Sequence, residues 1–140
     1  TSQSFHDLAE RVAMGARIEI QPCPDLVILV ETLALSYQDT YNTIQRYIQP
    51  LLDKGADTLI LGCTHFTHLK AVIQQVAGRN ITIISTEEAV AREVDRRLTM
   101  ENLHAKASDL GTVLMLSNSH KTGFEKQVTT LWGQADIQLF

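Results

Sequence analysis

The chain of 140 residues lacks several features that mark specialised classes of protein. It has only two cysteines, Cys23 and Cys63, which are too few for a disulfide framework and indicate a reducing, cytoplasmic setting. No apolar run approaches the roughly 18 residues of a membrane span, and no signal segment opens the chain. With a net charge of −4, the chain also lacks the basic excess typical of nucleic-acid-binding proteins. We therefore expect neither a membrane nor a nucleic-acid partner.

The composition that is present is that of an ordinary globular protein. The apolar share is 44% and the charged share 20%, and the length suits one domain or one domain with an appendage. The chain begins with Thr1 rather than methionine, so we expect a piece of a longer protein. A basic cluster of Arg92, Arg96 and Arg97 is interleaved with acidic residues, which predicts a solvated helix face.

Hydrophobic periodicity predicts helices and strands in alternation. Helical spacing of apolar residues predicts helices over residues 5–13, 40–52 and 66–76, with one or two helical turns within 26–35. Apolar or alternating runs predict strands over residues 17–21, 57–61 and 81–84, of which 57–61 reads as fully buried. Ser85 and Glu88 have the spacing of a capping box, which starts a helix to about residue 98.

This order of elements predicts an α/β fold with a parallel sheet and helices on both faces. A polar stretch over residues 101–111 interrupts the alternation. After it we expect a strand over 112–116, a helix over 123–132 and a strand over 137–140.

The candidate site is Gly62-Cys63-Thr64-His65, where an apolar strand meets a helix. In open α/β sheets, ligands bind beyond the carboxyl ends of the strands. We expect Thr64 to cap the helix, and we expect the helix start and a nearby imidazolium to raise the thiolate fraction of Cys63. The alternative is a small buried core cysteine. Two polar residues beside Cys63 would fit a core poorly, which favours the site.

A metal site is a second alternative, because Cys63, His65 and His68 include two histidines three residues apart. No fourth ligand is evident, and a metal would disable the thiol as a base. We therefore expect no metal, and we expect His68 to be a surface residue.

The motif Gly62-Cys63-Thr64-His65-Phe66 resembles the second-cysteine motif of glutamate racemases, within the aspartate/glutamate racemase superfamily. Related aspartate racemases usually carry Glu at the histidine position. Cys23-Pro24 followed by Leu29-Val30-Glu31, and later Glu88-Ala89-Val90-Ala91, resemble further family segments in the same order. The likeness extends over residues 1–98. Departures are Thr67, where members usually have Pro, and Ser85-Thr86, where many have Asp-Ser.

The resemblance implies one half of a two-domain racemase with a flavodoxin-like parallel sheet. Such enzymes interconvert L- and D-glutamate without a cofactor, by proton transfer between two cysteines, and supply D-glutamate for peptidoglycan. Cys63 would be one of the two, His65 would assist its proton transfer, and Thr64 would contact glutamate. The other cysteine would lie in a missing N-terminal domain, so we expect this chain alone to be inactive.

The resemblance also implies a division of the chain. Residues 1–104 would form the second α/β domain, and residues 105–140 would return to the missing first domain. Alone, this returning segment should either pack abnormally, for instance in a homodimer, or be mobile. Its match to the family is weak, and Asn118-Ser119-His120 departs from the usual pattern.

Three further residues receive no catalytic role. Cys23 lies between two prolines and is expected to be structural. Glu31 is interpreted as a helix-end charge in preference to a carboxylate at the edge of the site. Trp132 is expected to pack in the core or against the absent domain. Two functional alternatives stay open: a non-catalytic α/β module that binds phosphate or carboxylate, and an aspartate or hydantoin racemase.

Overall fold

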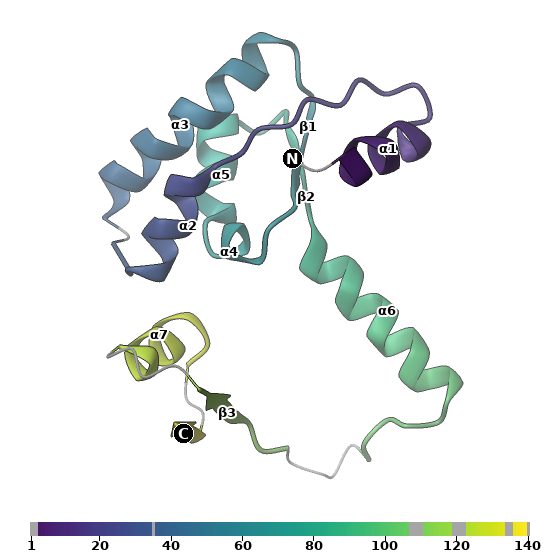
Figure 1. Cartoon of the computed structure of the whole chain (residues 1–140), viewed down its shortest axis with the longest axis vertical. Helices are drawn as coiled ribbons and strands as arrows, with labels where there is room; N and C mark the ends of the chain where they lie inside the picture. Colours follow the sequence, from purple (N-terminus) through teal and green to yellow (C-terminus); the bar gives the residue numbers. More distant parts are fainter. Residues whose placement is uncertain (1–2, 35, 107–110, 119–122, 134–135, 140) are drawn as a thin grey trace.

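The structure is a computed structural model that describes residues 3–34, 36–106, 111–118, 123–133 and 136–139 (Figure 1). The described part contains seven helices and four strands, arranged as two separate two-stranded parallel sheets. The helices are α1 (Gln3–Val12), α2 (Pro24–Glu31), α3 (Tyr37–Asp53), α4 (Thr64–Thr67), α5 (Lys70–Ala77), α6 (Thr86–Met100) and α7 (Phe124–Leu131). The strands are β1 (Thr58–Leu61), β2 (Thr82–Ser85), β3 (Leu114–Ser117) and β4 (Asp136–Leu139). The expected α/β class with parallel strands is confirmed.

The first sheet pairs β1 with β2 in parallel, from Thr58 opposite Thr82 to Leu61 opposite Ser85. Burial alternates along β1: Leu59 and Leu61 are buried, whereas Ile60 is 68% exposed. The expectation of a fully buried strand is therefore wrong, because the buried core lies on one face of this sheet and Ile84 is exposed on the other along with Ile60.

The core forms where α2, α3, α5 and the first sheet meet. It is built of eight buried apolar side chains: Leu26, Val30, Ile44, Ile48, Leu59, Leu61, Leu69 and Ile73. Tyr37 of α3 donates a hydrogen bond from its hydroxyl to Gln75 of α5 at 2.9 Å. This packing holds the end of β1, from which the candidate site extends.

The single helix expected over residues 66–76 is wrong in one respect, because two helices, α4 and α5, replace it. The amides of His68 and Leu69 donate to carbonyls three residues back, at 3.2 and 3.0 Å. Bonds of that spacing make a tighter turn than an α-helix. The turn inserts Leu69, which is 2% exposed, into the core and so fixes α4 against it.

The strand expected over residues 17–21 is also wrong, since these residues adopt no regular structure. Their charged side chains contact the end of α3 instead. Arg17 donates to the carbonyl of Lys54 at 3.0 Å, and Lys54 pairs with Glu19 at 2.7 Å. The alternation of Ile18 and Ile20 with charged residues resembles a strand pattern, but no neighbouring strand pairs with this segment within the described residues.

The capping box expected at the start of α6 does not form. Ser85 occupies the N-cap position without a side-chain bond to the backbone, and its hydroxyl donates to the carboxylate of Glu87 instead. Glu88 pairs with Lys70 of α5 at 2.6 Å, and Lys70 also donates to Ser85 at 3.1 Å. These bonds tie the start of α6 to α5 and to the end of β2.

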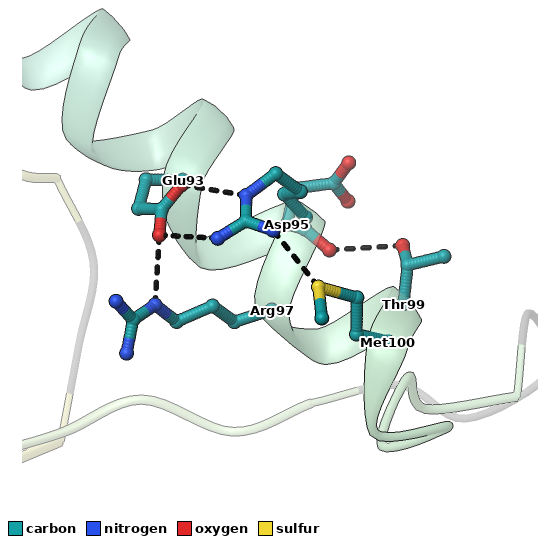
Figure 2. A network of polar contacts seen from close by, with 6 residues as sticks. Glu93, Asp95, Arg97, Thr99 and Met100 are labelled. Carbon is teal, nitrogen blue, oxygen red and sulfur yellow. Dashed lines mark hydrogen bonds and ion pairs between the residues drawn. The ribbon is translucent and has the colours of Figure 1, made fainter.

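The solvated face predicted for α6 is confirmed, since no residue of this helix is buried. Glu93 accepts bonds from both Arg96 and Arg97 at 2.8 Å, and Thr99 donates to the carbonyl of Asp95 one turn back (Figure 2). The hydrogen bond from Arg96, followed by that from Arg97, lowers the pKa of Glu93 to about 2.

The C-terminal elements lie apart from the first sheet, beyond α6, and α7 returns towards α2 and α4 (Figure 1). Here β3 pairs with β4 in parallel, and Leu131 of α7 packs against the core. Trp132 is 63% exposed, so it does not pack in the core, and the other expected place, against the absent domain, stays a prediction. The assignment of residues 105–140 to a first domain stays a prediction, and residues 119 and 120 lie outside the described residues.

Candidate active site

Cys63 lies just past the carboxyl end of β1, where α4 begins. Its backbone is extended, with φ −129° and ψ 137°, and it occupies the N-cap position of α4. Thr64 is therefore the first residue of α4, and the expectation that it caps the helix is wrong. The Cys63 side chain is partly exposed, and that of Thr64 is exposed. The thiol is thus accessible at the sheet edge where α/β proteins bind ligands.

His65 connects the thiol to a carboxylate from a different helix. Its Nδ1 lies 3.5 Å from Cys63 Sγ, and its Nε2 lies 2.7 Å from Glu31 Oε1. A neutral imidazole that donates from Nε2 to Glu31 can accept the thiol proton at Nδ1, and an imidazolium can donate to both neighbours. The three side chains therefore form a line, Cys63–His65–Glu31. One proton can reside either on the sulfur of Cys63 or on the ring of His65, while Glu31 contacts the other side of the ring.

Glu31 is a carboxylate at the edge of the site, which is the alternative that its sequence context did not favour. It ends α2, as expected of a helix-end charge, but its carboxylate contacts His65 across 34 positions of the sequence. A signal was present in the Leu29-Val30-Glu31 triplet, which places an acidic residue at the end of an apolar helix. Nothing in the spacing of residues 31 and 65 reveals that they meet.

The electrostatics of the line favour a charged pair. Burial alone would raise the pKa of Cys63, but the backbone amide and the ring of His65 outweigh it and lower that pKa below its usual value. The hydrogen bond to Glu31, followed by that to Cys63, raises the pKa of His65. Thiolate and imidazolium therefore stabilise each other, and both forms become more populated near neutral pH than in isolated side chains.

A cavity of about 290 Å³ adjoins this line. It lies between α2, α4 and α7, and its titratable lining groups are Glu31, His65 and His68. His68 is exposed, as expected, and it also borders this cavity. The remaining lining residues are predominantly apolar: Val30, Phe124, Gln127, Val128, Leu131 and Trp132.

Cys23 has a different environment from Cys63. Its Sγ donates to the carbonyl of Gln21 at 3.3 Å, and the side chain packs against the core. Burial, followed by the nearby charge of Asp25, raises the pKa of Cys23 to about 11. This thiol is therefore almost entirely protonated at neutral pH.

The metal alternative gains no support from the side chains that the structure describes. Among those residues, no group of three His, Cys, Asp or Glu side chains is arranged to hold a metal ion. His65 directs its two ring nitrogens at Cys63 and Glu31.

The family to which the chain belongs follows from a comparison with models of protein families. The model of the Asp/Glu/hydantoin racemase family matches residues 3–94. The chain belongs to this racemase family. Glutamate racemases of two bacteria are each 36% identical to it: that of Herpetosiphon aurantiacus over 124 residues, and that of Pseudomonas putida over 140 residues. The first alignment covers 89% of this chain and 49% of the relative, and the second covers 99% and 52%.

A solved racemase structure has the same fold. The crystal structure of the glutamate racemase RacE1 of Bacillus anthracis superposes with a TM-score of 0.82 at 24% identity, covering 98% of this chain and 52% of that one. The racemase-family chain thus spans about half the length of the relatives it matches. Within its described residues, no helix has the length and apolar character needed to cross a membrane.

Proposed function

We propose that this chain is one half of a cofactor-independent glutamate racemase that works in the cytoplasm and supplies D-glutamate for peptidoglycan synthesis. The observation that carries the proposal is the line of contacts from Cys63 through His65 to Glu31, at the carboxyl end of β1. Membership of the racemase family supports the reaction class, and the names of the 36% identical relatives support glutamate as the substrate.

The proposed reaction begins with Cys63 as a thiolate. The Cα–H bond of glutamate breaks, the proton passes to sulfur, and the electron pair stays on Cα. His65 stabilises the thiolate before this step, and Glu31 keeps the imidazole protonated and oriented. Thr64 follows Cys63 directly and is an exposed residue, which suits the proposed contact with substrate.

Inversion also needs an acid on the opposite face of the substrate. Cys23 does not fit this part because of its location: its side chain packs against the core, its thiol donates to the carbonyl of Gln21, and it does not line the cavity beside His65 and Glu31. We therefore assign the second proton donor to a cysteine in the part of the protein that lies outside this chain. The substrate would then bind between the two halves.

The complete protein and a Cys63→Ser variant test the proposal through the formation of D-glutamate from L-glutamate. We expect the complete protein to racemise glutamate, the variant to lose turnover, and a matched Cys23→Ser variant to keep it. The isolated chain should not racemise glutamate at a meaningful rate. Full turnover by the isolated chain, or by the Cys63→Ser variant, would contradict the two-thiol mechanism.

The same assay separates the alternatives. Aspartate and a hydantoin, offered in parallel, identify another substrate within the racemase superfamily. If the complete protein and its Cys63→Ser variant both bind glutamate and neither racemises any of these compounds, the chain belongs to a non-catalytic binding module.

A further inference from the structure

One polar side chain of α7 reaches the end of α2. Gln127 donates from Nε2 to the backbone carbonyl oxygen of Glu31 at 2.6 Å, across 96 positions of the sequence. The carboxylate of the same Glu31 holds His65, and His65 contacts Cys63. We propose that Gln127 is a positioning residue, which fixes the end of α2 so that the Glu31 carboxylate keeps His65 aligned with the Cys63 thiol.

The backbone at this helix end explains why such a donor matters. The last carbonyls of any helix have no partner within the helix. The carbonyl of Val30 accepts from the amide of Leu33 at 3.1 Å, and that of Leu29 accepts from Ala34 at 3.0 Å. Gln127 supplies a donor to the carbonyl of Glu31, the last residue of the helix.

The residues that follow α2 in the sequence also hold its end. Leu33 adopts a left-handed conformation with φ 54°, which only a minority of non-glycine residues do. This turn closes α2 directly after Glu31. The carboxylate is thus presented from a short, fixed helix end, and the Gln127 bond adds a constraint from a distant element.

The packing of α7 holds Gln127 near the end of α2. Val128 is 8% exposed, and Leu131 packs against the core, so α7 is anchored by two apolar residues that follow Gln127. Gln127 itself is half-buried and lines the cavity beside Glu31 and His65. No lining residue from α7 is charged, and the titratable groups facing the cavity are Glu31, His65 and His68. Gln127 therefore acts through position rather than through its own charge.

The consequence reaches the thiol through the two contacts already described. If the end of α2 is released, Glu31 is free to leave the 2.7 Å contact with Nε2 of His65. His65 then loses the partner that favours its protonated form, and Cys63 loses part of the interaction that favours its thiolate. The catalytic meaning of this effect rests on the proposed racemase function, whereas the effect on the thiol does not.

The test uses this chain and measures how fast iodoacetamide alkylates Cys63 as a function of pH, with the modified peptide located by mass spectrometry. Gln127→Met keeps the length of the side chain and its place in the cavity but removes the donor. Gln127→Ala is a second variant, which removes the donor and also the part of the side chain that lines the cavity. Thr130→Ala is the matched control, because Thr130 is an exposed residue of the same helix.

We expect both Gln127 variants to lower the alkylation rate of Cys63 at neutral pH by about two- to threefold. This is the size of effect expected when one hydrogen bond that orders the site is lost. Their rate profiles should move to higher pH, and the control should retain the profile of the unmodified chain. Circular dichroism of each variant establishes whether it is folded. The rate for Cys23 in the same sample serves as an internal reference.

Two results would overturn the proposal. One is a folded Gln127→Met chain whose Cys63 profile matches that of the unmodified chain. The other is global unfolding of both variants, which would make Gln127 a general structural residue. Because the measurement needs no substrate, a complete protein that fails to racemise glutamate would defeat the proposed function and leave this result standing.

Discussion

Replacing Glu31 by glutamine tests the contact that links α2 to the candidate site. The substitution keeps the size of the side chain and removes the negative charge that His65 faces at 2.7 Å. The His65 and Glu31 side chains are 30% and 54% exposed, so solvent screens their attraction. Ion pairs of this exposure contribute about 0.5–1 kcal/mol to the free energy of unfolding.

The sign of the pH dependence follows from the direction of the His65 shift. The pKa of His65 is raised above its usual value of 6.5, first by the bond to Glu31 and then by the bond to Cys63. The stabilisation is therefore fully present below pH 6.5 and is lost as the pH rises through the folded-state pKa. Between about pH 5.5 and 8.5, the unmodified chain should lose about 0.5–1 kcal/mol more stability than the Glu31→Gln variant.

Urea unfolding at the two pH values measures this difference, and contributions common to both chains cancel in the comparison. Glu19→Gln is the matched control, because the hydrogen bond from Lys54 lowers the pKa of Glu19, and this carboxylate therefore stays charged at both pH values. The control should follow the pH dependence of the unmodified chain. Identical pH dependences for Glu31→Gln and the unmodified chain would refute the His65–Glu31 interaction.

Three further substitutions test the fold. Thr40→Val should raise the free energy of unfolding by about 1 kcal/mol in urea, because the buried hydroxyl has no hydrogen-bond partner in the described part of the chain; a loss of stability would show that the hydroxyl is bonded. Met14→Gly should raise the melting temperature through a gain of about 0.5–1 kcal/mol, because Met14 is 97% exposed with φ 46°; a lower melting temperature would speak against that backbone conformation. Gly62→Ala should fold with its stability unchanged or about 0.5 kcal/mol higher, because the new methyl group meets open space; unfolding of this variant would contradict the open environment.

Periodicity predicted most elements of the fold because it reports on packing against a core. The apolar spacing of residues 40–52 marks α3, whose Ile44 and Ile48 are both buried. The same reasoning failed at residues 17–21, where alternating Ile18 and Ile20 have no neighbouring strand. A strand depends on its partner, which a local pattern does not contain.

The break between α4 and α5 was missed for a related reason. Phe66, Leu69 and Ile73 have helical spacing, and a continuous helix would also place them on one face. The tight turn at His68 and Leu69 follows from the depth to which Leu69 enters the core, which is a tertiary property.

The sequence predicted those contacts of the candidate site that join residues close to each other in the chain. It did not predict the contacts that join residues far apart in the chain. Cys63 and His65 belong to one motif, and the structure brings them into contact. Glu31 and Gln127 come from helices far away in the sequence, and only the packing of α2 and α7 brings them to the same place. Contacts of this kind depend on the whole fold rather than on any local signal.

The most direct test of the central claim compares the two cysteines of this chain in one alkylation experiment across a range of pH. Cys63 should react as a thiolate at markedly lower pH than Cys23, whose pKa is about 11. Mutation of His65 to Gln should move the Cys63 profile to higher pH and leave that of Cys23 in place. Equal profiles for the two thiols, or a Cys63 that does not react in the folded chain, would contradict the account of Cys63 as an accessible proton-transfer group.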